Sequence, residues 1–179
     1  SGTESIGFTH ITSEEWLKKV GSVGRPSGCE IHILNDEAEP LLAGQRGKVF
    51  FSGREVVAYH NDPKKTAAAR SPQGYSTMGD LGYVDADGYL FLTDREAFTI
   101  ISGGVNVYPR EVEEAISTDS RVAEAAVFGS PDNDLGEAVT AVVELQRDYE
   151  PTLNIAKMIR ERLRVRLSPH KLPRKLAFV

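Results

Sequence analysis

Residues 98–117 read FTIISGGVNVYPREVEEAIS, and they mark the change from a strand-rich half of the chain to a mixed one. The apolar run 98–101 predicts a short strand that ends at the two glycines that follow it. Pro109 suits the first turn of a helix, where its missing N–H is not needed. Three apolar residues spaced three and four apart then predict the buried face of that helix: Val112, Ala115 and Ile116.

The residues after this helix predict the rest of a small domain. A strand is expected over 125–128, closed by Gly129-Ser130-Pro131, and a second strand over 137–146, where apolar and polar residues alternate. The last helix is expected to bury a stripe of residues spaced four apart: Ile155, Ile159, Leu163 and Leu167. The order strand, helix, strand, strand, helix is typical of an α+β domain, which we place at residues 95–179.

The first half of the chain reads as strands joined by Gly, Pro and Asp turns. Residues 29–35 alternate in polarity, and the short apolar runs 48–51 and 55–58 are separated by Ser52-Gly53. Residues 82–93 predict a hairpin whose turn is Asp85-Ala86-Asp87-Gly88, because Asp-Gly supplies the positive φ of a tight turn. The fold class is therefore α/β (α+β), with a β-rich part over residues 1–94 followed by the small α+β domain.

Composition excludes several classes of protein. The 179 residues carry a net charge of −5, which argues against a nucleic-acid-binding protein. Between Lys157 and Lys175 lie eight basic residues against one acid, and a solvated helix face is favoured there over a phosphate-facing edge. The lone Cys29 fits a reducing cytoplasm, and no apolar run approaches the roughly 20 residues of a membrane span. The oligomeric state is left open.

Three short segments could bind a ligand, and each also has a plain structural explanation. Thr3-Glu4 offers a hydroxyl and a carboxylate, which suit a phosphate and Mg²⁺. Asp80 after Gly79 could hold two ribose hydroxyls or simply cap a turn. The glycines after Ser102 could let a backbone approach a ligand or form a tight turn. Neither a Walker loop nor a Gly-x-Gly-x-x-Gly motif is present, and the four histidines show no metal-ligand spacing.

Taken together, these segments resemble the adenylate-forming superfamily, which includes acyl-CoA synthetases, luciferases and peptide-synthetase adenylation domains. The resemblance covers nearly the whole chain and rests on six motifs in order. These are Ser1-Gly2-Thr3-Glu4, Gly21 to Pro26 (GSVGRP), Tyr59 to Thr66 (YHNDPKKT), Tyr75 to Arg95, Ile100 to Glu113 (IISGGVNVYPREVE), and Pro131-Asp132 with Gly136-Glu137. It implies the C-terminal fragment of an ATP-dependent fatty- or aryl-acid CoA ligase, with ATP, Mg²⁺, a carboxylic acid and coenzyme A as its small-molecule partners.

The resemblance also implies a role for each matching residue. Thr3 would contact the α-phosphate and Glu4 would help to hold Mg²⁺. Asp80 would bind the ribose hydroxyls, and Arg95 would close on the same sugar. Three residues would line the passage for the pantetheine arm of coenzyme A: Ser102, Gly103 and Gly104.

The sequence departs from the motifs at several places. Ser1 replaces the usual Gly, and Tyr75 and Met78 replace the usual Trp and Thr. Ala97 stands where a polar hinge residue is common, so the small domain is expected to rotate about a small apolar residue. The phosphate loop is expected before Ser1 and the adenylation lysine after Val179, so no catalytic residue is expected within these 179 residues and the fragment alone should be inactive.

Two other functions fit the same residues. One is an adenylation enzyme whose acceptor is a carrier protein, or a luciferase-type enzyme, although the glycines at 103 and 104 disfavour the latter. The other is a non-catalytic module that binds a nucleotide or coenzyme A.

Overall fold

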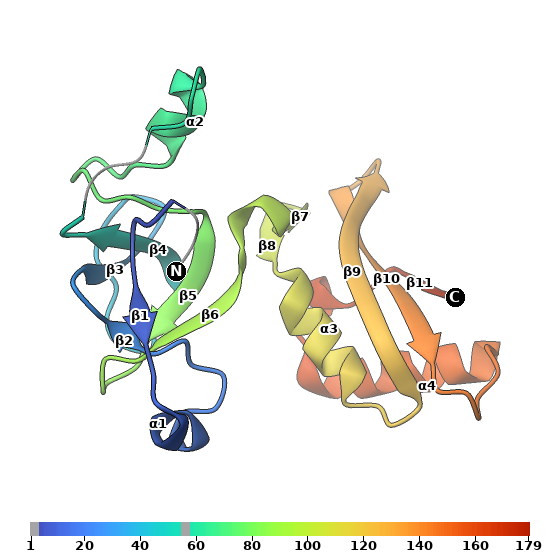
Figure 1. Cartoon of the computed structure of the whole chain (residues 1–179). Coiled ribbons are helices and arrows are strands. Elements are labelled where there is room, and N and C mark those ends of the chain that lie inside the picture. Colours follow the sequence, from blue (N-terminus) through green and yellow to red (C-terminus); the bar gives the residue numbers. More distant parts are fainter. Residues whose placement is uncertain (1–3, 55–57) are drawn as a thin grey trace. The chain divides into compact units, whose positions relative to one another are not determined.

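The computed structural model describes residues 4–54 and 58–179, which fall into two compact units, Ser1–Ala97 and Phe98–Val179 (Figure 1). The predicted mixed α/β class is confirmed. Among the described residues, no helix is both long and apolar enough to cross a membrane.

The first unit is built on a four-stranded antiparallel sheet in the order β3-β4-β5-β6. Its strands are β3 (Glu30–Leu34), β4 (Gly47–Ser52), β5 (Asp80–Val84) and β6 (Leu90–Arg95). Alternation brings Ile33, Val49 and Phe51 to one buried cluster, which Ile6 and Leu90 complete. Around the sheet lie β1 (Thr9–His10), β2 (Arg25–Pro26), α1 (Ser13–Lys18) and α2 (Pro63–Ala68).

The predicted hairpin is confirmed as β5 and β6. Asp85 accepts backbone hydrogen bonds from Asp87 and Tyr89 at 3.0 and 2.9 Å, and Gly88 has a φ of 84°. Strand β3 lies at the predicted position. Most of the predicted run 55–58 lies outside the described residues.

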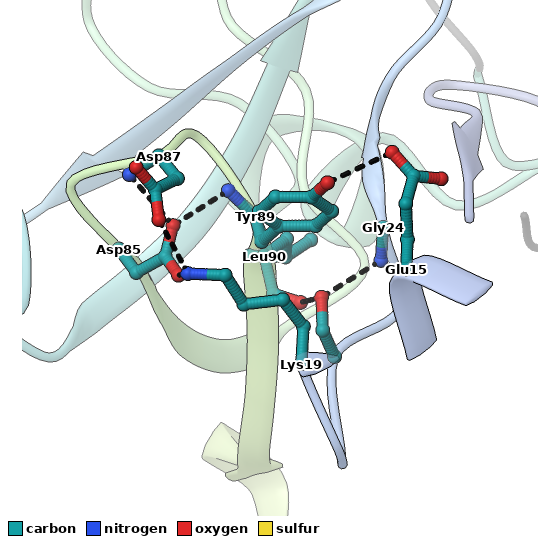
Figure 2. A network of polar contacts seen from close by, with 8 residues as sticks. Glu15, Lys19, Gly24, Asp85, Asp87, Tyr89 and Leu90 are labelled. Carbon is teal, nitrogen blue, oxygen red and sulfur yellow. Dashed lines mark hydrogen bonds and ion pairs between the residues drawn. The ribbon is translucent and has the colours of Figure 1, made fainter. Parts of the chain in front are cut away.

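Helix α1 is fastened to the turn of this hairpin by a polar network (Figure 2). The Tyr89 hydroxyl donates to Glu15 at 2.8 Å. The Lys19 ammonium donates to Asp85 at 2.7 Å and to Asp87 at 2.6 Å. The network therefore fixes the β5–β6 hairpin at the end opposite to Asp80 and Arg95.

The second unit packs two helices against a five-stranded sheet. Its elements are β7 (Ile100–Ser102), β8 (Val105–Val107), α3 (Pro109–Ser117), β9 (Val122–Asp132), β10 (Gly136–Leu145), α4 (Leu153–Arg166) and β11 (Lys175–Phe178). Strand β10 pairs with β9 along its length, with parallel β11 over residues 140–143, and with β7 at Gly136. The buried core combines one face of each helix with one face of β10, and it includes Val112, Ile116, Val139, Val143, Ile159 and Leu163.

Several predicted boundaries in this unit are wrong. Phe98 belongs to the short 3₁₀ turn η1 (Glu96–Phe98), and the strand begins at Ile100. Strand β9 does not end at Gly129 but continues to Asp132. It is an edge strand that pairs with β10 alone, and such a strand tolerates Pro131, which has no N–H to donate to a second partner. Helix α4 ends at Arg166, and Leu167 is a buried residue just beyond it.

Strands β8 and β11 are missing from the prediction. Residues 105–107 lead into the predicted helix but form a hairpin with β7. Residues 175–178 follow the 3₁₀ turn η2 (Pro169–Lys171) and pair with a strand more than thirty residues earlier in the chain. Neither segment is long enough to show a strand period of its own.

Candidate nucleotide site and glycine turn

Asp80 and Arg95 form the last residue pair of the β5–β6 ladder. The Nε atom of Arg95 lies 3.2 Å from Oδ1 of Asp80. Directly opposite residues of an antiparallel pair project their side chains to the same face of the sheet, which brings the carboxylate and the guanidinium together. The structure thus joins two of the residues predicted to bind the nucleotide, at one corner of the first unit.

The strand pairing is irregular on both sides of Asp80. In the β5–β6 ladder, Leu81 pairs with Asp94 but Gly82 pairs with Leu92, so Thr93 is an extra residue in a bulge. In the β4–β5 ladder, regular pairing ends at Lys48–Leu81. Bulges re-aim side chains and are common beside functional sites, so the irregular pairing supports Asp80 as a candidate site residue.

Gly79 shapes the backbone immediately before Asp80. Its φ is 79°, a conformation that favours glycine, and its carbonyl accepts a hydrogen bond from the Glu96 amide at 2.8 Å. Apart from Gly79 and its two chain neighbours, no described residue has an atom within 4 Å of the position that a Cβ would occupy there. Open space therefore adjoins Asp80 on the side of Gly79.

Glu4 lies in a separate cluster of polar contacts. Its Oε1 atom accepts a hydrogen bond of 3.4 Å from the Tyr59 hydroxyl, and burial together with this carboxylate raises the pKa of Tyr59. The Tyr59 amide in turn donates to the Thr66 hydroxyl at 2.9 Å, so the two ends of the 59–66 motif are in contact. Thr3 lies outside the described residues.

Ser102, Gly103 and Gly104 form the tight turn between β7 and β8. Ser102 pairs with Val105 across a two-residue loop, and the φ values of the glycines are 59° and 78°, the geometry of a type I′ hairpin. Ser102 is buried, whereas both glycines are exposed. The glycines are therefore explained by the positive φ values that this tight turn requires. Because both are exposed, their backbone is also accessible to a ligand.

The β9–β10 turn holds this glycine turn in place, and the sequence alone did not reveal it. The Glu137 carboxylate accepts from the Ile101 amide at 2.8 Å, and the Leu135 carbonyl accepts from the Gly103 amide at 2.9 Å. A Cβ on Gly129 would lie 2.7 Å from Glu137 Oε1, so the glycine makes room for that side chain. The Pro131–Glu137 motif thus supports the glycine turn between β7 and β8, and not only the β9–β10 turn in which it lies.

The predicted hinge residue, Ala97, lies in η1, and it is the last residue of the first unit. The described residues contain no group of three or more His, Cys, Asp or Glu side chains that could hold a metal ion. A Mg²⁺ ion bound mainly by substrate phosphates and water would need only one or two carboxylates, and the partly exposed Glu4 has the required oxygen ligands.

Residues 111–179 match the family model of the AMP-binding enzyme C-terminal domain. Over 98% of its length the chain is 37% identical to the sulfoacetate–CoA ligase of Cupriavidus necator, of which it covers 36%. The chain belongs to the adenylate-forming superfamily. A second adenylate-forming relative is the long-chain-fatty-acid–CoA ligase of Bacillus subtilis, 36% identical over 98% of this chain and 31% of that one.

Solved adenylate-forming structures share the fold. The o-succinylbenzoate CoA synthetase of Bacillus subtilis, in complex with its acyl-adenylate intermediate, superimposes with a TM-score of 0.77 at 31% identity over 96% of this chain and 34% of that one. An ATP-bound RpMatB-BxBclM chimera gives a TM-score of 0.82 at 34% identity, over 89% and 32% of the two chains. The chain spans about a third of the length of the curated relatives it matches.

Proposed function

We propose that this chain supplies the ribose-binding and CoA-facing parts of an AMP-forming acid–CoA ligase. In the first step, a carboxylate oxygen of the acid attacks the α-phosphorus of ATP, and the bond to pyrophosphate breaks. In the second step, the thiol of coenzyme A attacks the acyl carbon, loses its proton and displaces AMP. The cytoplasm is the proposed site of action, in keeping with a single, unpaired cysteine.

The observation that carries the proposal is the Asp80–Arg95 pair beside the open space at Gly79. A carboxylate can accept hydrogen bonds from two vicinal hydroxyls, and such charge-assisted bonds are stronger than neutral ones. The side chain of Asp80 is 14% exposed and that of Arg95 is 60% exposed. Asp80 is therefore the fixed member that would recognise the ribose, and Arg95 is the member free to close on it.

The other roles follow the same residue types. Thr3 would donate a hydrogen bond to the α-phosphate, and Glu4 would offer an oxygen to Mg²⁺, which would neutralise phosphate charge when bound. The exposed backbone at Gly103 and Gly104 would form one wall of the pantetheine passage. Ala97 would absorb the change in φ and ψ as the second unit rotates between the two steps.

The test is a titration of the chain with AMP and with 2′-deoxy-AMP, followed by calorimetry or by amide NMR shifts. We expect the wild-type chain to prefer AMP. Asp80→Asn should weaken AMP binding by about tenfold or more and abolish the preference, because a hydrogen bond to a charged group is lost. Glu37→Gln, which neutralises an exposed acid of the same unit, is the matched control.

Two results would contradict the proposal. One is equal affinity of the wild-type chain for the two nucleotides. The other is an Asp80→Asn variant that keeps both the affinity and the preference of the wild type.

A further inference from the structure

The ladder between β4 and β5 is broken by two extra residues, directly before Asp80. Lys48 pairs with Leu81, and the next bridge joins Phe51 to Ser76. Two residues of β4, 49 and 50, thus face the four residues 77–80. The segment that ends in Asp80 must bulge away from the sheet, so the regular β4–β5 ladder does not continue opposite it.

Thr77 closes this gap with its side chain. Its hydroxyl donates to the Val49 carbonyl at 2.7 Å, where a ladder amide would otherwise bind. The same oxygen accepts from the Gly79 amide at 3.0 Å. Thr77 is 8% exposed, and its own amide donates to the Ala69 carbonyl at 3.0 Å. One buried hydroxyl therefore connects the rigid central strand to the glycine that sets the direction of Asp80.

The bulge has a second attachment on its far side. The Gly79 carbonyl accepts from the Glu96 amide, and the Glu96 carboxylate lies 2.7 Å from the ammonium of Lys48 on β4. Gly79 is thus held through its N–H by Thr77 and through its C=O by Glu96. The peptide groups on both sides of Gly79 are fixed, although the ladder is absent there.

We propose that Thr77 is the positioning residue of the ribose-binding carboxylate. This inference rests on the proposed function, because it assigns Thr77 an effect on the nucleotide through Asp80. Its hydroxyl holds the bulge in the conformation that presents Asp80 to the sugar, and Thr77 itself does not touch the ligand.

The test compares Thr77→Val with Thr77→Ser, each in the wild-type and the Asp80→Asn background. Valine has nearly the same shape but lacks the hydroxyl, whereas serine keeps it. We expect Thr77→Val to weaken AMP binding by about fivefold to tenfold, the effect of one or two lost hydrogen bonds, and Thr77→Ser to stay within about twofold of the wild type. In the Asp80→Asn background, Thr77→Val should cause no further loss, because residues acting through one another are not additive.

The outcomes separate the two proposals. If Asp80→Asn weakens binding while Thr77→Val binds as the wild type does, the positioning role is overturned and the ribose role stands. An additive loss in the double variant also overturns it. If Asp80→Asn has no effect, the proposed function fails instead. Should Thr77→Val not fold, hydrogen exchange of the Gly79 amide in the wild type decides, since exchange at the rate of an open amide would contradict the hydrogen bond.

Discussion

The Nε atom of Arg95 lies 3.2 Å from Oδ1 of Asp80, across the final residue pair of the β5–β6 ladder. The two partners differ in environment, since the carboxylate is largely buried and the guanidinium largely exposed. An ion pair with one solvent-facing partner adds little to stability. The pair is therefore better suited to binding a ligand than to holding the sheet together.

Arg95→Ala should reduce the affinity for AMP by about threefold to tenfold while changing the free energy of unfolding by less than about 1 kcal/mol. Titration and urea unfolding measure the two effects separately. Arg95→Lys is the control, because it keeps the charge but not the planar fork, and it should give an intermediate affinity. A large loss of stability at unchanged affinity would identify Arg95 as a structural residue.

Asp119 should matter for stability rather than for binding. Its carboxylate is buried in the second unit and accepts from Arg121 Nε at 2.8 Å and Nη2 at 2.6 Å, with Arg162 at 3.5 Å. Asp119→Asn should lower the free energy of unfolding by about 1 to 3 kcal/mol, because it leaves the partly buried Arg121 guanidinium without its carboxylate partner. Asp148→Asn, at an exposed position, should change it by less than about 0.5 kcal/mol.

The same residue predicts a dependence on pH. The hydrogen bonds from Arg121 hold the pKa of Asp119 below its ordinary value. The carboxylate therefore contributes its full stability above a pH of about 4 and loses it as the pH falls through the lower, folded-state pKa. Urea unfolding between pH 2 and 7 should show a smaller acid-induced loss in Asp119→Asn than in the wild type. Equal losses would contradict this assignment.

Substitutions at Gly103 and Gly104, in the turn between β7 and β8, should lower the free energy of unfolding by different amounts. Gly104→Ala should cost about 1 kcal/mol, since alanine is strained at a φ of 78° although space is available. Gly103→Ala should cost more, because its Cβ would lie 3.1 Å from Leu135 Cδ2. Gly104→Asn should cost least, because asparagine tolerates this conformation. Urea unfolding ranks the three variants, and a neutral Gly103→Ala would refute the steric part.

Glu15 should titrate at unusually low pH. Its pKa is lowered to about 2, first by the backbone hydrogen bond from Thr12 and then by the Tyr89 hydroxyl. Tyr89→Phe should raise the midpoint of the Glu15 carboxyl, followed by ¹³C NMR, without restoring the ordinary value, because the Thr12 bond remains. Tyr83→Phe, on the neighbouring strand, is the matched control. An unchanged midpoint in Tyr89→Phe would exclude that hydrogen bond.

Local patterns were sufficient to predict the parts of the fold that depend on near neighbours. The hairpin around Asp85 and Gly88, the helix begun by Pro109 and the stripe on α4 each combine a period with a turn or cap signal. Strand β11 exists because it pairs with β10, and nothing within residues 175–178 reports that partner. Long-range pairing is where single-sequence prediction fails.

The candidate site divides in the same way. Asp80 and Arg95 belong to sequence motifs, and the hairpin register brings them together. Thr77 and Glu137 each hydrogen-bond a distant backbone group, 28 and 36 positions away, and their neighbours in the sequence give no indication of these partners. The binding roles of Thr3, Glu4, Asp80, Arg95 and the glycine turn, and the hinge role of Ala97, stay predictions.

The bulge at residues 77–80 costs the sheet part of the hydrogen-bond ladder between β4 and β5. A chain two residues shorter between Ser76 and Leu81 would let β4 and β5 pair without interruption, in the same face-to-face alternation, and the domain would gain ladder hydrogen bonds. The shortened chain would form a more stable sheet, but it would lose the bulge that presents Asp80. Under the proposed function, the ribose-binding aspartate therefore lies in a two-residue insertion into an otherwise continuous sheet, and the ladder hydrogen bonds lost at residues 77–80 are the cost in stability of presenting it.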